Sequence, residues 1–224
     1  MKNIKSTAFV LQRTNYGESD RIIHVLTPEH GKISLIAKGV RKQKSKLAPA
    51  IELFSLSTIV VHFGQSELGI LTSAKLEIFY ENILKNYDRL QFGYEVIKYI
   101  KHLSEHVREE RLFDFVRVAL ESLNDESIDI RITKAWAYLH LADLKGHAIN
   151  MSRDNENQPL LATERYRFDV ADMVFIKDTK GTFSADHLKL LKLLTLKTPH
   201  IISHVSGIRP FLDDCVHVAH AVSE

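Results

Sequence analysis

The spacing of apolar residues changes once along this chain, and that change limits the folds open to it. Up to about residue 75, apolar residues fall in short runs or alternate with polar ones, and turn residues separate the runs. From about Leu76 onward they recur every three or four residues, as on one face of a helix. We therefore predict an α+β protein, with a β domain over residues 1–77 and a mostly helical domain over residues 78–224.

The first 75 residues contain five predicted strands joined by short turns. In one of them, Ile33, Leu35 and Ala37 alternate with Lys32, Ser34 and Lys38, which is the period of a half-buried strand. Five such strands favour a small closed barrel of the OB type. A five-stranded SH3-like barrel fits the same pattern. The predicted strands cover residues 7–13, 20–27, 33–37, 53–63 and 68–73.

Three amphipathic stripes follow, and each predicts a helix. The clearest is Leu112, Phe115, Val116, Ala119, Leu120 and Leu123; the others run through residues 90–103 and 128–142. Gly146 is typical of the residue just after a helix. Further along, Ser184 is a predicted N-cap, Pro199 ends the helix it begins, and Pro210 lies in the first turn of the last helix.

Between the third and fourth predicted helices lies an insert of about residues 147–187. Its first part, residues 147–167, is polar and irregular. Residues 168–183 predict a hairpin that turns around residues 178–181, where Asp178 and Gly181 supply turn chemistry.

The charge of the chain is divided unevenly. Residues 1–77 hold 11 Lys and Arg against 6 Asp and Glu, a net of +5, whereas residues 78–224 hold 19 against 22, a net of −3. Such asymmetry favours a polyanionic partner for the front of the molecule.

The basic excess is concentrated in the loop between the third and fourth predicted strands. Within nine residues the loop carries five cations, no acid and one glycine, and each cation can displace a counterion from a nucleic-acid backbone. Arg13 and Arg21, at nearby strand ends, would extend this surface. The alternative is a loop that only keeps the protein in solution. The five loop cations are Lys38, Arg41, Lys42, Lys44 and Lys46.

Barrels that bind single strands often stack bases on aromatic side chains. Tyr16, in the turn after the first strand, is the one aromatic residue here that we expect at the surface, where it either contacts a base or packs on the next strand. We assign Phe9, Phe54 and Phe63 to the core.

The titratable residues do not form a pattern that predicts catalysis or metal binding. His200 and His204 are four residues apart, and Cys215, His217 and His220 share one helix, but zinc needs three or four convergent ligands. We expect Asp213 and Asp214 to lie in the first turn of the last helix, where their negative charge stabilises the helix dipole. We therefore predict no enzyme activity, no metal and no cofactor.

The sequence also bears on location and on partners. The single cysteine, the lack of a secretory leader and the lack of a long apolar run predict a cytoplasmic protein with no membrane segment. Arg131 and Lys134 precede Trp136 on one predicted helix. They could receive an acidic and hydrophobic peptide tail, or could simply be part of a solvated face.

An ordered string of motifs in the first 75 residues closely resembles the opening domain of the RecO family. It comprises Val10-Leu11, then residues 16–22 (YGESDRI), residues 27–33 (TPEHGKI), residues 37–42 (AKGVRK) and residues 45–47 (SKL). The helical stretch that ends in residues 139–146 is compatible with the middle of that family, and the likeness is weak beyond about residue 150.

The resemblance implies an N-terminal OB barrel, a helical body and a role in recombinational DNA repair. RecO-like proteins bind single- and double-stranded DNA and anneal complementary strands. They contact the acidic tail of single-stranded DNA-binding protein, and with RecR they help RecA to load in the RecF pathway, where they associate with the nucleoid.

This chain departs from the family pattern at one point. Many RecO proteins carry a four-cysteine zinc module in the second half. Ser184 and His187 stand where the second cysteine pair would be, and residues 150–156 contain no cysteine. The insert at 147–187 must therefore fold without zinc.

Three other functions remain open on the residues alone. The first is an RNA-binding barrel outside DNA repair. The second is a nuclease that uses Asp20 and neighbouring acids with a divalent metal. The third is a purely structural scaffold, which would leave the loop cations unexplained.

Overall fold

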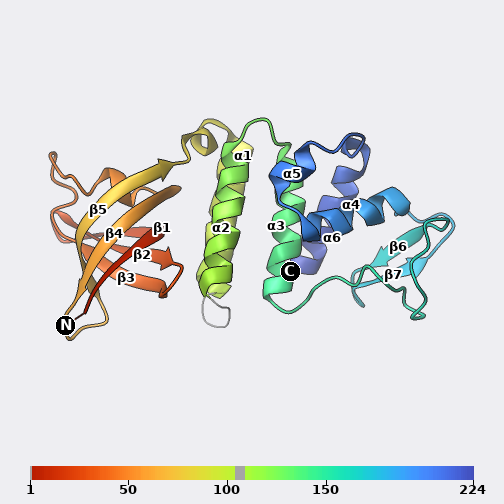
Figure 1. The fold of residues 1–224 in the computed structure, drawn as a ribbon, viewed down its shortest axis with the longest axis horizontal. Helices are drawn as coiled ribbons and strands as arrows, with labels where there is room; N and C mark the ends of the chain where they lie inside the picture. Colours follow the sequence, from red (N-terminus) through yellow and green to blue (C-terminus); the bar gives the residue numbers. More distant parts are fainter. Residues whose placement is uncertain (1, 104–108) are drawn as a thin grey trace. The chain divides into compact units, whose positions relative to one another are not determined.

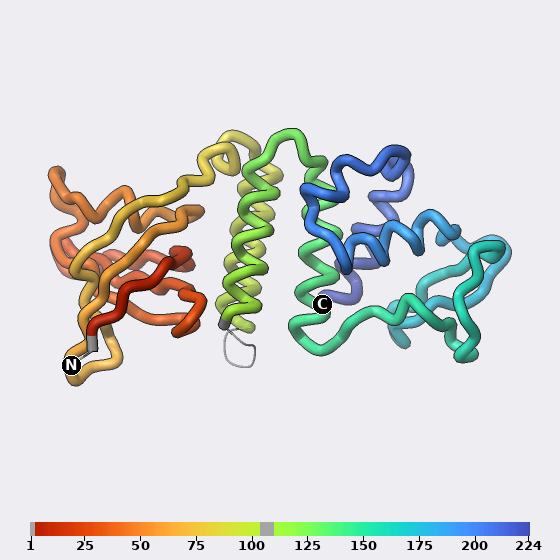
Figure 2. Tube along the Cα trace, viewed as in Figure 1, coloured from red at the N-terminus to blue at the C-terminus, as the bar shows by residue number. Residues whose placement is uncertain are grey.

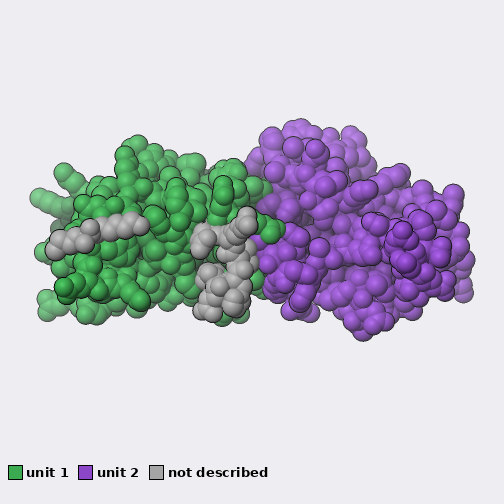
Figure 3. Space-filling view, turned by 60° about the horizontal axis from the view of Figure 1, so that its bottom comes forward, with its two compact units in different colours: residues 1–124 green, residues 125–224 purple. Residues whose placement is uncertain are grey.

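The computed structural model describes residues 2–103 and 109–224 (Figure 1). The chain forms two compact units, residues 1–124 and residues 125–224 (Figure 3), and each is described by itself. Figure 2 follows the path of the chain through both.

Unit 1 begins with a closed five-stranded barrel, as predicted. Its strands are hydrogen-bonded in the order β1-β2-β3-β5-β4, and an antiparallel β1–β4 pair closes the ring. All neighbours are antiparallel except β3 and β5, which are parallel. This is an OB-like barrel. The strands are β1 (Lys2–Tyr16), β2 (Asp20–Thr27), β3 (Gly31–Ala37), β4 (Ser55–Phe63) and β5 (Gly69–Phe79).

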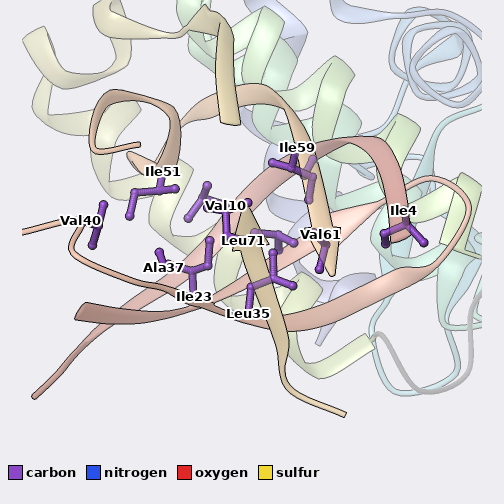
Figure 4. Close-up of a cluster of buried hydrophobic side chains, with 12 residues drawn as sticks. Ile4, Val10, Ile23, Leu35, Ala37, Val40, Ile51, Ile59, Val61 and Leu71 are labelled. Atoms are coloured by element: carbon purple, nitrogen blue, oxygen red, sulfur yellow. The ribbon is translucent and has the colours of Figure 1, made fainter. Parts of the chain in front are cut away.

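The interior of the barrel is filled by aliphatic side chains from every strand (Figure 4). These residues alternate with outward-facing ones because successive side chains of a strand point to opposite faces. Gly69 leaves room for three of its neighbours, since a Cβ there would lie 2.6 Å from Val61 Cγ1. The labelled core residues are Ile4, Val10, Ile23, Leu35, Ala37, Val40, Ile51, Ile59, Val61 and Leu71.

Two helices complete unit 1, α1 (Tyr87–Leu103) and α2 (Glu109–Asn124), after a 3₁₀ turn at Glu81–Lys85. The α2 helix packs on β2 and β3. The ring of Phe113 on α2 lies 4.8 Å from that of Phe9 on β1. Because α2 packs against the barrel strands, the first compact unit ends at Asn124, whereas the predicted β domain ends at residue 77.

Unit 2 is helical and is built around α3 (Ile130–Leu144), which packs most extensively on α6 (Leu212–Ser223). Gly146 follows α3 with a φ of +84°, as predicted for a helix end. Cys215 is fully buried on α6, and burial raises the pKa of its thiol to about 12. The remaining elements are α4 (Ala185–Leu196), α5 (Pro199–Ser203) and a 3₁₀ turn at Arg209–Phe211.

The insert contains a short hairpin, β6 (Tyr166–Asp169) and β7 (Val174–Lys177), but its turn differs from the prediction. The strands are joined through residues 170–173. There the Asp169 carboxylate accepts hydrogen bonds from two backbone amides, and Met173 adopts a φ of +54°. The predicted turn at residues 178–181 exists, but it leads to Phe183, whose backbone pairs with Tyr166.

Aromatic packing and a helix cap that involves a histidine side chain stabilise the insert. Rings are in contact from Phe168 through Phe175 and Phe183 to His187, at centroid distances of 5.0 to 5.5 Å. The buried His187 accepts a hydrogen bond from the Ser184 amide at Nδ1 (3.1 Å), and its Nε2 lies 3.1 Å from Asp214 Oδ2. Ser184 is thus the N-cap of α4, as predicted, and His187 joins that cap to α6.

Two findings apply to the described parts of the chain. None of their helices is both long and apolar enough to cross a bilayer. Within the same residues, no three His, Cys, Asp or Glu side chains are placed so that they could hold a metal ion.

Candidate nucleic-acid interface

The loop that follows β3 is fixed to the turn between β1 and β2. The Arg41 amide donates to the Ser19 carbonyl (2.9 Å), and its guanidinium Nη1 donates to the Gly17 carbonyl (3.2 Å). A third bond runs from the Gly39 amide to Asp20 Oδ1 (2.7 Å). Two segments about twenty residues apart in sequence therefore form one surface.

Asp20 organises this surface through its negative charge. The hydrogen bond from Gly39 lowers the pKa of the Asp20 carboxyl, and Ser19, Lys38 and Lys42 lower it further. Lys38 directly precedes Gly39 in the chain, and the side chain of Lys42 lies beside Gly39, the residue whose amide the carboxylate holds. Because Oδ1 accepts bonds from Gly39 and Ser19, Asp20 has a structural role here.

Apolar residues on both sides of the exposed cations anchor the loop in the protein. Val40 is 2 % exposed, Ala50 2 % and Ile51 0 %, and Val40 and Ile51 belong to the barrel core. Gly39 has a φ of +64°, a conformation that favours glycine, and this lets the chain turn sharply after β3. The loop is therefore attached at several points, and its polar side chains are displayed from a defined backbone.

The five predicted loop cations are all exposed, which meets the first requirement for phosphate contact. Lys38 and Lys42 lie near Asp20, and Arg41 lies over the β1–β2 turn. Lys44 and Lys46 follow on the same loop. The Arg41 guanidinium also holds the β1–β2 turn through its bond to the Gly17 carbonyl.

The two arginines on the strands are placed differently from the loop cations. Arg13 forms an ion pair with Glu52, and its side chain is only 23 % exposed. Its charge is therefore already compensated. Arg21 Nε donates to Asn15 Oδ1 (3.2 Å) beside the β1–β2 turn. The adjacent Tyr16 is 53 % exposed, so it does not pack into the barrel.

In unit 2, Arg131 is engaged by acids. It pairs with Asp129 (2.7 Å) and Asp213 (3.0 Å), and these contacts raise the pKa of its guanidinium above the usual range, the hydrogen bond that it donates to Asp129 being the largest cause. It thereby links the start of α3 to the first turn of α6. Lys134 lies one turn further along α3 and is half-buried. Asp213 and Asp214 do lie in the first turn of α6, but their side chains contact Arg131 and His187.

A second cationic group on the barrel was not singled out from the sequence. Lys32 Nζ donates to the Lys101 carbonyl at the end of α1 (3.3 Å). Nearby, His24 Nδ1 lies 2.8 Å from Ser34 Oγ. Burial lowers the pKa of His24, and the charges of Lys32 and Lys101 lower it further. The alternation of Lys32 and Ser34 was visible in the sequence, but the approach of α1 was not.

Comparison with known proteins supports the resemblance found in the motifs. The family model described as "Recombination protein O N terminal" matches residues 1–79, which contain the whole barrel. The protein "DNA repair protein RecO" of Alkaliphilus metalliredigens is 33 % identical over 148 residues, which cover 64 % of this chain and 58 % of that protein. Less than two thirds of that relative is therefore aligned.

Other relatives align over more of the chain. "DNA repair protein RecO" of Dehalococcoides mccartyi is 28 % identical over 199 residues, covering 86 % of this chain and 78 % of that protein. The protein of the same name from Bacillus pumilus is 28 % identical over 195 residues, covering 84 % of this chain and 71 % of that protein. With the barrel matched and the helical part aligned, this chain is similar to RecO DNA repair proteins along most of its length.

Proposed function

We propose that this protein binds single- and double-stranded DNA, anneals complementary strands and helps RecA to load in the RecF recombination pathway. One observation carries the DNA-binding part: five exposed cations, with no acid among them, project from a loop that is fixed to the barrel. The family supplies the link to repair.

The physical basis of annealing would be charge neutralisation. Two DNA strands repel each other through their phosphates, and each lysine that replaces condensed counterions lowers that repulsion locally. Such a protein holds two backbones close together while the bases pair, and no covalent bond is made or broken. We therefore propose that it acts without catalysis. Asp20 is the residue that the nuclease hypothesis would use, and its carboxylate accepts hydrogen bonds from Ser19 and from the Gly39 amide of the loop.

We also propose three protein partners: RecR, the acidic tail of single-stranded DNA-binding protein and, indirectly, RecA. Arg131 and Lys134 are the candidate contacts for the acidic tail. Because Arg131 already pairs with two acids, the tail would have to displace Asp213, the more exposed of them at 78 %. Titration with an acidic tail peptide tests this: Lys134→Glu should weaken binding, and unchanged affinity would exclude this surface.

Annealing of complementary oligonucleotides, with and without their coating protein, tests the main proposal. We expect the wild-type protein to speed annealing of bare strands and to retain activity on coated ones. No acceleration on either substrate would contradict the proposal. Direct competition between DNA and RNA strands of equal length tests the alternative, an RNA-binding barrel, which predicts that RNA is the better competitor.

A further inference from the structure

One face of α1 carries a row of exposed residues with the spacing of a coiled-coil seam. The row consists of Tyr87, Gln91, Tyr94 and Lys98. They follow one another at intervals of four, three and four residues, and all four are exposed. This is the spacing of the a and d positions through which two helices pack. Tyr87 is 77 % exposed and Tyr94 48 %, so the row presents two aromatic rings to solvent, as one half of a helix pair would.

The other faces of α1 belong to the core of unit 1. Phe92, Val96 and Ile100 are all buried, and the helix packs on α2. Tyr94 touches the core at one edge, where its ring lies 5.3 Å from that of Phe54. The exposed row is therefore displayed from a helix that is fixed in the fold, and the core of unit 1 forms without covering it.

The charges of α1 that are not buried are divided between its two halves. The acids come first, at Asp88 and Glu95, and the bases come last, at Lys98, Lys101 and His102. This order suits the helix dipole. It also makes the face self-complementary, because a second copy that runs antiparallel sets the acidic half of each helix against the basic half of the other. A purely acidic or purely basic partner would complement only one half.

The same row distinguishes an antiparallel pair from a parallel one. In a parallel pair each residue meets its own equivalent, so Lys98 would face Lys98 and Asp88 would face Asp88, and like charges repel. In an antiparallel pair a positions meet d positions. Tyr87 of each copy then meets Lys98 of the other, and Gln91 meets Tyr94 on either side of a two-fold axis. A lysine over a tyrosine ring is a favourable cation–π contact.

We propose that α1 is a self-association surface, through which two copies of this chain pair antiparallel about a two-fold axis between Gln91 and Tyr94. The contact is a single helix of 17 residues, or about 25 Å at 1.5 Å per residue. The area that it buries lies at the low end for protein pairs, so the dimer is weak and forms at roughly 10 to 100 µM.

Pairing gives the proposed annealing a physical arrangement. One chain has one cationic loop, whereas a two-fold dimer carries two, one for each strand. This consequence rests on the proposed function, but the pairing itself does not. If the chain pairs and does not anneal, the proposed function fails and the surface stands. If a strictly monomeric chain anneals, the proposed function stands and the surface fails.

Sedimentation equilibrium of the full chain without DNA, from about 1 to 300 µM, tests the pairing. We expect the average mass of the wild type to rise towards twice that of the monomer. The double variant Tyr87→Ala with Lys98→Glu should stay monomeric, and both side chains are exposed, so the fold is not at risk. The matched control, Tyr16→Ala with Lys192→Glu, makes the same changes at exposed positions elsewhere and should associate like wild type. A monomeric wild type, or equal losses in variant and control, would overturn the proposal.

Cysteine cross-linking tests the orientation, because the native Cys215 is fully buried and does not compete. Tyr87→Cys and Lys98→Cys are prepared as separate single variants. In the antiparallel pair each new cysteine lies about eleven residues, or roughly 16 Å along the axis, from its own equivalent, which is too far for a disulfide. An equimolar mixture should therefore give at least about fivefold more linked dimer on mild oxidation than either variant alone. Cross-linking of each variant alone, with no gain on mixing, would show a parallel contact and overturn the proposal.

Discussion

Asp20 and Gly39 are joined by a hydrogen bond of 2.7 Å between carboxylate Oδ1 and backbone nitrogen, across the gap between two loops. Gly39 is the second residue of the cationic segment, directly after Lys38, so this bond helps to fix where Lys38 and Lys42 are displayed. The surface that we assign to DNA therefore depends on an acid.

The Asp20→Ala variant should loosen the loop without unfolding the barrel. With the acceptor gone, we expect the Gly39 amide to exchange with solvent at least about tenfold faster, because the bond that protects it is lost. Amide hydrogen exchange at neutral pH measures this. An unchanged Gly39 rate would show that Asp20 does not hold the loop.

The same bond predicts a dependence on pH. The pKa of Asp20 is lower in the folded protein than in the unfolded chain, so its stabilising effect is complete above the unfolded value of about 3.9 and is lost as pH falls through the lower folded value. The Gly39 amide shift, followed by NMR, should therefore titrate only at acid pH. The Asp20→Asn variant is the control and should show no such titration.

Gly181 is a position where any side chain collides with backbone. A Cβ there would lie 2.3 Å from the carbonyl carbon and oxygen of Tyr166, so Gly181→Ala should lower the free energy of unfolding by about 2–3 kcal/mol. Thermal or urea unfolding measures the change. Gly64→Ala is the control, because a Cβ at Gly64 meets nothing within 4 Å, and equal stability of the two variants would contradict the packing described here.

Metal chelators should not change the stability of the insert. Its place in the fold depends on the aromatic contacts and on His187, which bonds both the Ser184 amide and Asp214. We expect the melting temperature to be the same with and without chelator, and His187→Ala to cost about 2–3 kcal/mol through the lost cap and ring contacts. A fall in melting temperature on chelation that zinc reverses would contradict this.

Arg131 should contribute to stability only modestly. Its two ion pairs lie partly in solvent, and Arg131→Gln should cost about 0.5–1 kcal/mol, less at high salt. Lys189→Gln removes a fully surface pair with Asp186 and should cost less than that. Urea unfolding measures the loss of unfolding free energy in both variants. Equal losses would show that Arg131 does not link α3 to α6.

Local patterns in the sequence were enough to predict the barrel, the helix ends at Gly146 and Ser184, and the exposure of the loop cations. Each depends on residues close together in the chain. The hairpin turn was misplaced because Asp169 and Met173 make a turn without glycine. The partners of Arg13 and Arg131 were missed because Glu52 and Asp213 lie far away in sequence.

The most direct test of the central claim compares two triple charge reversals. One is Lys42→Glu, Lys44→Glu and Lys46→Glu in the loop; the other is Lys180→Glu, Lys192→Glu and Lys197→Glu, which makes the same net charge change at exposed lysines of unit 2. Single-stranded DNA affinity is measured by fluorescence over a range of salt concentrations. The loop variant should bind about a hundredfold more weakly at low salt, with a salt slope smaller by about 2, while the control stays within about threefold of wild type. Equal losses in the two variants, or a loop variant that binds like wild type, would contradict the claim that this loop holds the DNA backbone.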